Sequence, residues 1–281
     1  MTVPPGTLYV VATPIGNLGD LSPRAAQVLR SVRAVAAEDT RRTLKLYAHL
    51  GAPAPPLLSL PAFDERARVE GILVRLRAGE DVALCTDAGT PGVSDPGQAL
   101  VAAAWEAGVR VVPVPGPVAA VAALAASGLP SDRFLVAGFL PRKGRGRAEA
   151  LAWLGTVPAT LVLYEAGNRT GGTLRDLAAA FGDRPAAVAR ELTKVHEEIV
   201  RGTLGALAAR FAEGALGEVT LVVGGAPEGA ARAEPAEPLE DELRRRLAAG
   251  EAPTGIAREV ARSRGLRRAE VYDALERLKR T

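Results

Sequence analysis

The sequence contains one cysteine, Cys85, and only two histidines, His49 and His196, in 281 residues. One cysteine excludes an internal disulfide framework, and the shortage of both residue types argues against a zinc cluster. No apolar run approaches the roughly 20 residues that a membrane-spanning helix needs. Residues 1–5 lack the charged start and apolar core of a signal peptide. We therefore expect a cytoplasmic protein that holds no metal.

The composition is that of a globular protein, with 48% hydrophobic residues and a net charge of only +3. The chain is long enough for one large or two modest domains. Its charge is uneven, because residues 244–281 contain 11 basic and 5 acidic side chains, against 24 and 27 in the first 243. A basic C-terminal segment on a mildly acidic body indicates a polyanionic partner. A solvated pair of basic helices is the plainer alternative.

The segment 87–97 (DAGTPGVSDPG) lies between an apolar strand pattern at 81–86 and a helical pattern at 98–107. Loops that follow the carboxyl ends of strands line the ligand crevice of an open α/β sheet. The three glycines and two prolines of this loop fix the backbone and leave its polar groups accessible. The sequence therefore predicts a ligand-binding loop here, with an ordinary tight turn as the alternative.

Other predicted strands in the first half end in loops of similar character. The strand patterns 7–12, 34–37 and 109–114 lead into 13–20, the charged segment 38–42 and 115–120. In the charged segment, Asp39 and Arg41 either lie at the mouth of the crevice or form a helix cap with flanking surface charges. We expect a parallel α/β domain over residues 1–114.

In the second half the predicted strands are closer together, which indicates a mixed, partly antiparallel sheet within a second α/β domain at 115–225. The basic, glycine-rich segment 138–147 is interpreted as a loop that either clamps phosphates or connects domains. A Gly/Ala/Pro/Glu linker at 226–238 precedes three helical patterns at 239–249, 254–264 and 268–280. Residues 239–281 are therefore predicted to form a small, helix-turn-helix-like tail whose basic charge suits a polyanion.

Several motifs together resemble a known family. They are LYVVATPIGNL at 8–18, AEDTR at 37–41, DAGTP at 87–91, PGP at 115–117, GLPSDRF at 128–134 and GFLP at 138–141. From Thr7 to the C-terminus the chain resembles the ribosomal RNA small subunit methyltransferase I family of the tetrapyrrole methylase superfamily. The resemblance implies a homodimer of two-domain α/β chains with S-adenosylmethionine between the domains. It also implies 2′-O-methylation of a cytidine ribose in the decoding region of 16S ribosomal RNA, in free RNA or in the 30S subunit.

The resemblance implies cofactor contacts in both halves of the chain. Many superfamily members have aspartate where this chain has Thr90, so their hydrogen bonds do not transfer directly. The predicted cofactor-binding residues are Pro14, Ile15, Asp87, Ala88, Gly89, Thr90, Val93, Val118, Ala119, Tyr164 and Leu192.

A ribose 2′-hydroxyl is a poor nucleophile at neutral pH, so a base or a strong hydrogen-bond acceptor should assist it. Carboxylates at predicted strand ends are Asp39, Asp87, Glu165 and Glu191. We rank Asp39 and Asp87 first, with Arg41 or Asn17 orienting the substrate. Backbone capping is the alternative for each carboxylate. The residues predicted to bind RNA are Arg142, Lys143, Arg145, Arg262, Arg264, Arg267 and Arg268.

Three other functions are compatible with parts of this pattern. A methylase of tetrapyrroles or of a diphthamide precursor would leave the basic tail unexplained. A non-enzymatic RNA-binding module would leave the cofactor-type loops unexplained. A nicotinamide dehydrogenase would need G-x-G-x-x-G after the first strand, and residues 14–19 (PIGNLG) do not supply it.

Overall fold

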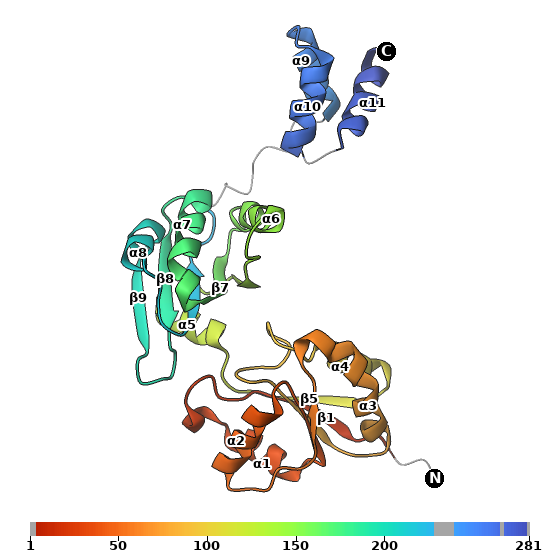
Figure 1. Ribbon diagram of the computed structural model, residues 1–281, viewed down its shortest axis with the longest axis vertical. Coiled ribbons are helices and arrows are strands. Elements are labelled where there is room, and N and C mark those ends of the chain that lie inside the picture. The colour runs from red at the N-terminus through yellow and green to blue at the C-terminus, as the bar shows by residue number, and fades with distance from the viewer. Residues whose placement is uncertain (1–3, 228–238, 265–266, 280–281) are drawn as a thin grey trace. The chain divides into compact units, whose positions relative to one another are not determined.

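The computed structural model describes residues 4–227, 239–264 and 267–279, except the side chains of 262–264 and 279. The chain divides into two compact units, residues 1–226 and 227–281, which are described separately. The first unit contains two five-stranded sheets (Figure 1). None of the described helices is both long and apolar enough to cross a membrane.

The first sheet is entirely parallel, with strand order β3-β2-β4-β1-β5. Its strands are β1 (Thr7–Val11), β2 (Ala34–Ala37), β3 (Leu57–Ser59), β4 (Val82–Cys85) and β5 (Arg110–Val114). Helices connect them: α1 (Pro23–Ser31), α2 (Thr40–Leu50), α3 (Glu65–Arg77) and α4 (Gln98–Glu106), with short 3-10 turns at Leu18–Asp20 and Ala62–Asp64. The predicted parallel α/β fold of this half is confirmed.

Apolar strands explain why this sheet is covered on both faces. Every residue of β2 and β4 is buried, as expected for parallel strands between helix layers. Leu8, Leu84 and Leu100 belong to the cluster on the face of α3 and α4. Leu29 and Tyr47, on α1 and α2, pack against the other face. The sheet is thus a rigid support for the loops at its carboxyl edge.

The second sheet is mixed, as predicted, with strand order β6-β7-β10-β8-β9. Only β6 and β7 pair in parallel; the other pairings are antiparallel. The strands are β6 (Phe134–Phe139), β7 (Thr160–Ala166), β8 (Pro185–Arg190), β9 (Glu198–Thr203) and β10 (Glu218–Val223). The helices are α5 (Ala119–Ser127), α6 (Arg145–Leu154), α7 (Thr170–Phe181) and α8 (Leu204–Arg210), with a 3-10 turn at Gly167–Arg169.

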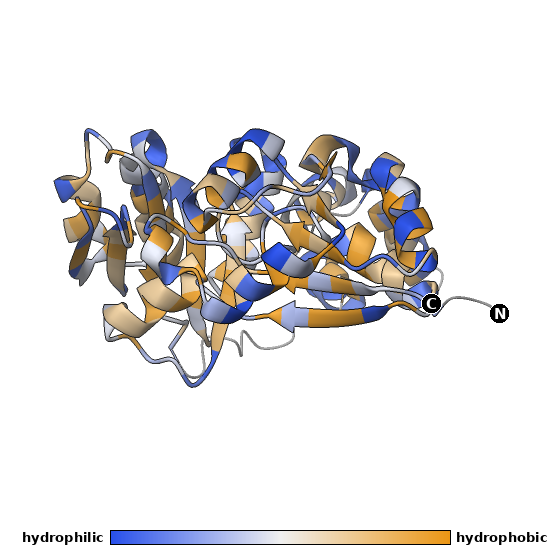
Figure 2. Ribbon diagram, turned by 90° about the horizontal axis from the view of Figure 1, so that it is seen from below, coloured by the Kyte–Doolittle hydropathy of each residue, from blue (hydrophilic) through white to orange (hydrophobic). Residues whose placement is uncertain are grey.

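Helices cover both faces of the second sheet as well. Small side chains on α5, among them Ala120 and Ala123, pack directly against strand residues such as Val162 and Val222. Helices α6, α7 and α8 supply Leu154, Leu174, Leu177 and Leu204 to the larger core on the other face. Figure 2 shows hydrophilic and hydrophobic residues along the same helices, as expected for helices with one face on a sheet.

The prediction of a continuous basic loop at 138–147 is wrong at both ends. Strand β6 extends to Phe139, and α6 begins at Arg145. Arginine and glycine obscured the helical spacing, although Arg145 pairs with Glu149 one turn later. Residues 140–144 remain as a short connection. The predicted domain boundary at 114 and 115 falls between β5 of the first sheet and α5 on the second.

The described residues of the second unit form three helices, as the apolar spacing predicts: α9 (Leu239–Ala248), α10 (Pro253–Arg264) and α11 (Arg268–Lys279). Their shared core includes the fully buried Leu243, Ile256, Val260, Val271 and Leu275. Most of the predicted linker at 226–238 lies outside the described residues.

Candidate functional site

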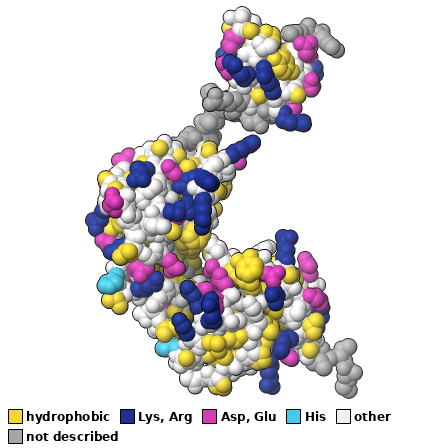
Figure 3. Space-filling view, in the orientation of Figure 1, with side chains coloured by type: hydrophobic (Ala, Val, Ile, Leu, Met, Phe, Trp, Pro, Cys, Tyr) yellow, Lys and Arg dark blue, Asp and Glu magenta, His cyan; other side chains and the backbone are white. Residues whose placement is uncertain are grey.

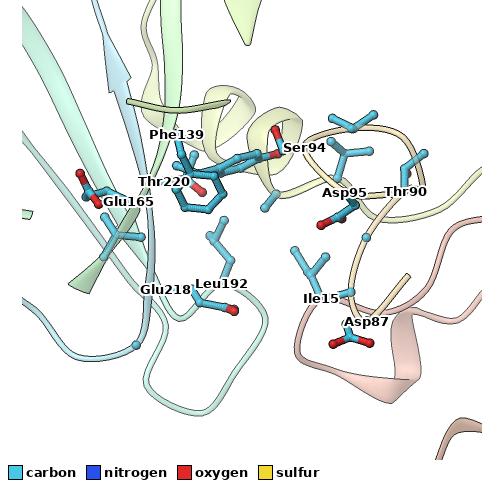
Figure 4. A pocket seen from close by; sticks show the side chains of 18 of the residues that line it. Ile15, Asp87, Thr90, Ser94, Asp95, Phe139, Glu165, Leu192, Glu218 and Thr220 are labelled. Atoms are coloured by element: carbon cyan, nitrogen blue, oxygen red, sulfur yellow. The ribbon is translucent and has the colours of Figure 1, made fainter. Parts of the chain in front are cut away.

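A pocket of about 480 Å³ opens where loops at the carboxyl edge of the first sheet meet the second sheet. Figure 4 shows Ile15, Asp87, Thr90 and Asp95 on one side of this pocket. The other side is formed by residues of β6, β7, β10 and the loop that follows β8. A pocket of this size and mixed lining suits a small-molecule ligand.

The structure brings ten of the eleven predicted cofactor residues into the lining of this pocket; Pro14 is the exception. They reach it from four separate loops, from the start of α5 and from β7. The lining residues from the prediction are Ile15, Asp87, Ala88, Gly89, Thr90, Val93, Val118, Ala119, Tyr164 and Leu192.

Backbone hydrogen bonds join the loops of the first sheet. The amide of Thr13 donates to the carbonyl of Gly89 at 2.8 Å, and the amide of Gly89 donates back at 3.1 Å. The hydroxyl of Thr90 donates to the carbonyl of Pro117 at 3.3 Å. Gly89 has a φ of +85°, a conformation that glycine adopts without steric cost. The three loops therefore form one connected rim.

The loop after β8 contacts the first loop of the chain. A Cβ on Gly16 would lie 2.9 Å from the carbonyl oxygen of Leu192 and 2.6 Å from Cγ of Lys194. Glu191 and Thr193 in this loop have φ values of +50° and +67°. This left-handed conformation is unfavourable for residues other than glycine. Lys194 holds Glu191 through an ion pair of 3.0 Å. This strained loop places Leu192 in the pocket.

Three carboxylates, Glu38, Asp87 and Asp95, line the pocket at the first sheet. The amide of Asp87 donates to Glu38 Oε2 at 3.1 Å, and Arg42 Nε lies 3.2 Å from Asp87 Oδ2. Burial raises the pKa of Glu38 and of Asp87. Burial, together with the negative charges of Glu38, Asp87 and Glu218, raises the pKa of Asp95 to about 6. The pocket thus contains carboxylates that hold protons more tightly than usual.

Asp39 and Arg41 lie outside the lining of this pocket. Asp39 caps α2 by accepting from the amide of Arg41 at 2.8 Å, and the Arg41 guanidinium lies 2.6 Å from its other oxygen. Hydrogen bonds from Arg41 lower the pKa of Asp39 to about 2, which makes it a weak base. The placement favours the plainer expectation of a helix cap beside a surface charge.

Glu165, also a candidate from the sequence, is 3% exposed and lines the pocket. Its carboxylate accepts from the hydroxyl of Thr173 at 2.6 Å and from the amide of Ala166 at 2.9 Å. Arg147 on α6 donates to Thr173 Oγ1 at 3.0 Å. These contacts fix the carboxylate, so Glu165 has the features of a structural member of the pocket wall.

Several pocket residues are not among those that the sequence predicts. Some had a signal: Glu38 and Arg42 adjoin the predicted Asp39 and Arg41, and Ser94 and Asp95 belong to the loop already singled out. Phe139 belongs to the GFLP motif, Ala166 adjoins Glu165, and Lys194 lies two residues after Leu192. Gly217 and the β10 residues had no signal, because the pairing that brings β10 beside β7 is not visible in a single sequence. The residues missed are Glu38, Arg42, Ser94, Asp95, Phe139, Ala166, Lys194, Gly217, Glu218, Val219 and Thr220.

The residues predicted to bind RNA have different surroundings. Arg142 and Lys143 are exposed and form no ion pair with other described residues, whereas Arg145 pairs with Glu149 at 2.5 Å. In the second unit, Arg267 pairs with Glu270 at 2.6 Å, and Arg268 lies over the ring of Tyr272. The side chains of Arg262 and Arg264 lie outside the described residues. Figure 3 shows basic side chains gathered near α6 beside a hollowed part of the first unit.

The part of the chain that the structure describes contains no group of three or more His, Cys, Asp or Glu side chains able to hold a metal ion. Glu38, Asp87 and Asp95 give the pocket an acidic edge. Such an edge complements a positively charged group.

Comparison with known proteins identifies related chains and folds. Residues 7–208 match the family model described as Tetrapyrrole (Corrin/Porphyrin) Methylases. The protein named ribosomal RNA small subunit methyltransferase I of Xylella fastidiosa (strain Temecula1) is 53% identical over 80% of this chain and 83% of its own. The protein of that name from Synechocystis sp. is 46% identical over 95% and 96%.

Solved structures show the same fold at lower identity. Uroporphyrin-III C-methyltransferase from Thermus thermophilus, complexed with S-adenosylhomocysteine, has a TM-score of 0.57 at 22% identity over 78% of this chain and 97% of its own. Diphthine synthase has a TM-score of 0.61 at 17% identity, over 78% and 90%. At these identities the likeness concerns the fold alone.

Proposed function

The chain belongs to the ribosomal RNA small subunit methyltransferase I family of tetrapyrrole methylases, and on this basis we propose that it methylates ribosomal RNA. In this proposal the methyl group of S-adenosylmethionine passes to the 2′-hydroxyl of a cytidine ribose in the decoding region of the small subunit. The observation that carries the proposal is the pocket at the edge of the parallel sheet, lined by ten of the residues predicted to bind the cofactor.

The pocket has the chemistry that S-adenosylmethionine requires. When bound, this cofactor supplies an electrophilic methyl group on a positively charged sulfur. Ile15, Val118 and Leu192 provide apolar contact area, and Asp87 and Asp95 provide negative charge. Thr90 is already bonded to the carbonyl of Pro117, so it fixes the loop rather than replacing an aspartate. The protein's task is then to align the nucleophile with the methyl carbon.

An exposed aromatic side chain that is followed in sequence by two exposed cations supports RNA as the substrate. Phe139 is 60% exposed, although it lines the pocket, and its ring centroid lies 5.6 Å from that of Tyr164. Arg142 and Lys143 follow it closely in sequence. Exposed aromatic rings stack unpaired nucleobases, and nearby cations neutralise phosphates. Phe139 is therefore suited to hold a base whose ribose enters the pocket.

Other parts of the proposal follow from the family. We infer a homodimer acting on 16S RNA, either free or within the 30S subunit, in the cytoplasm, where ribosomal subunits are assembled. The basic helices of the second unit would add phosphate contacts.

The decisive experiment is methyl transfer from labelled S-adenosylmethionine to small ribosomal subunits that lack the modification, and in parallel to free RNA. Nuclease mapping then locates the label. We expect one labelled cytidine ribose. No label on either substrate, with cofactor binding intact, would overturn the proposal in favour of a small-molecule substrate such as a tetrapyrrole.

A further inference from the structure

Asp95 differs from the other carboxylates of the pocket in having no bonding partner among the residues that the structure describes. It lies between β4 and α4, is half-buried, and lines the pocket (Figure 4). Within residues 4–227, its carboxylate forms no hydrogen bond or ion pair, whereas Asp87 pairs with Arg42 and Glu191 pairs with Lys194. A half-buried carboxylate without a partner is costly to maintain, so its position needs an explanation.

The backbone around Asp95 holds the carboxylate in place. Ser94 has a φ of +63°, and Gly97 has a φ of +131°. Ser94 is not a glycine, so this left-handed conformation carries a steric cost. The carboxylate of Glu65 accepts from the amides of Gly97 at 3.0 Å and Ala99 at 2.7 Å, which fixes the loop at the start of α4. The strained segment is thus held from the side away from the pocket.

The second sheet also contacts this segment, through β6. Gly138 has a φ of +66°, and a Cβ there would lie 3.1 Å from Ser94 Oγ. Gly138 also lies at the register shift in the pairing of β6 with β7. The two halves of the first unit therefore meet at Ser94, and Asp95 is the next residue.

The charges that face Asp95 come from several elements. Glu38 follows β2, Asp87 follows β4 and Glu218 begins β10; their negative charges, together with burial, raise its pKa to about 6. The cations of this pocket, Arg42 and Lys194, are already paired with other carboxylates. Asp95 is therefore ionised at neutral pH, yet it binds a proton more readily than an ordinary aspartate. A general base works best with a pKa close to the working pH.

We propose that Asp95 is the general base of the methyl transfer, accepting the proton of the attacking 2′-hydroxyl; this inference rests on the proposed function. The 2′-oxygen forms a bond to the methyl carbon while the carbon–sulfur bond breaks, and its electrons remain on sulfur, which leaves as a neutral thioether. The hydroxyl proton passes to Asp95 and from there to solvent. No oxidant, metal or further reactant is needed.

The other carboxylates fit this role less well. Asp39 is bound to Arg41 outside the pocket. Glu165 accepts from Thr173 and Ala166, and Asp87 accepts from the amide of Asp39 besides pairing with Arg42. In each case donated hydrogen bonds or a paired cation already stabilise the ionised carboxylate, whereas Asp95 has no such partner within residues 4–227.

The test compares Asp95→Asn with the wild type in single-turnover methylation of the RNA substrate between pH 5 and 9. Asp132→Asn, which changes an exposed aspartate away from the pocket, is the matched control. For the wild type, the logarithm of the rate should rise with pH at a slope of one and level off above about pH 6. Asp95→Asn should lower the rate at least 100-fold and remove the inflection from the pH–rate profile. Its dissociation constant for S-adenosylhomocysteine should stay within about threefold of the wild-type value.

Two further variants separate proton transfer from a structural role. Asp95→Glu should restore the inflection at reduced rate, and Asp95→Ala should be accelerated by added acetate. If the Asp95→Asn variant kept the wild-type rate, or kept the inflection in its pH–rate profile, the assignment would be overturned. If the Asn variant does not fold, acetate rescue of Asp95→Ala decides the question instead. If the wild type labels no RNA, the proposed function itself is overturned. If the wild type labels RNA and Asp95→Asn does so equally well, only the assignment of Asp95 is overturned.

Discussion

Glu38 and Asp87 are joined across the carboxyl ends of β2 and β4, because the amide of Asp87 donates to Glu38 Oε2 at 3.1 Å. Asp87 Oδ1 in turn accepts from the amide of Asp39 at 3.1 Å. The side chain of Glu38 thus binds the backbone of Asp87, and the side chain of Asp87 binds the backbone of Asp39. Such paired bonds hold the charged segment and the glycine-rich loop in register at the edge of the pocket.

Asp87→Asn should lower methylation by about tenfold while changing the melting temperature by only a few degrees. The Asn oxygen can still accept from the amide of Asp39, so the loop remains in place. The variant loses the charge that faces Arg42 and the cofactor site, and a loss of about 1.4 kcal/mol corresponds to tenfold in rate. Single-turnover kinetics and thermal unfolding of the same preparations measure both. An unchanged rate would exclude any role for this carboxylate in the reaction.

Asp95→Asn should stabilise the fold at pH 8, although it should lower the rate of methylation at least 100-fold. Because the folded-state pKa of Asp95, about 6, lies above its ordinary value of 3.8, ionisation of Asp95 disfavours the folded state. The free energy of unfolding of the wild type therefore gains a contribution from Asp95 as the pH falls from 6 towards 4. The Asp95→Asn variant should lack this contribution, because asparagine does not ionise. Since Asp95 is only half-buried, we expect about 1–2 kcal/mol at pH 8 and almost nothing below pH 4.

Denaturant unfolding at pH 4, 6 and 8 measures this difference. Asp132→Asn again serves as the control, since that residue is exposed. A constant difference between Asp95→Asn and the wild type at all three values would show that Asp95 does not titrate in this range.

The sequence predicted those parts of the site that follow parallel strands. Ile15 and Thr90 lie in loops directly after β1 and β4, and the carboxyl ends of parallel strands meet at one edge. Thr220 could not be found in this way, because it enters the pocket from the middle of the antiparallel β10. Leu192 was found only through the family resemblance. Its loop depends on positive φ values at Glu191 and Thr193, which composition does not reveal.

Phe139→Ala should weaken RNA binding by about 10- to 100-fold, because stacking of a base on an aromatic ring contributes about 1–3 kcal/mol. Binding of S-adenosylhomocysteine should change little, since Tyr164 remains. Phe63→Ala is the matched control: Phe63 is 92% exposed but does not line the pocket. Fluorescence anisotropy with a labelled RNA fragment measures the difference. Equal losses in both variants would show that Phe139 holds no base.

The double variant Arg142→Gln and Lys143→Gln should lower the slope of log affinity against log salt by about one to two, as expected for the loss of two phosphate contacts. Arg267→Gln should lower the slope less, because Arg267 is partly neutralised by Glu270. Arg66→Gln, on the exposed surface of α3, controls for net charge. RNA titrations at several salt concentrations provide the slopes. A double variant with the wild-type slope would leave residues 142 and 143 without a role in binding.

Gly16→Ala should weaken binding of S-adenosylhomocysteine by about tenfold or more. The added Cβ would lie 2.8 Å from Thr193 Oγ1 and 2.9 Å from the carbonyl oxygen of Leu192, so the first loop and the loop after β8 must move apart. Backbone atoms cannot yield as a flexible side chain can, and displacing Leu192 opens the pocket wall.

Gly71→Ala is the control for this change, because it lies in α3 with nothing within 4 Å of the added Cβ. That variant should be slightly more stable than the wild type, since alanine favours a helix over glycine. Calorimetry with S-adenosylhomocysteine separates the two variants. If Gly16→Ala bound the ligand as the wild type does, contact between these loops would not be needed to form the cofactor site. In that case the loops joined by the hydrogen bonds between Thr13 and Gly89 would be sufficient to form the cofactor site.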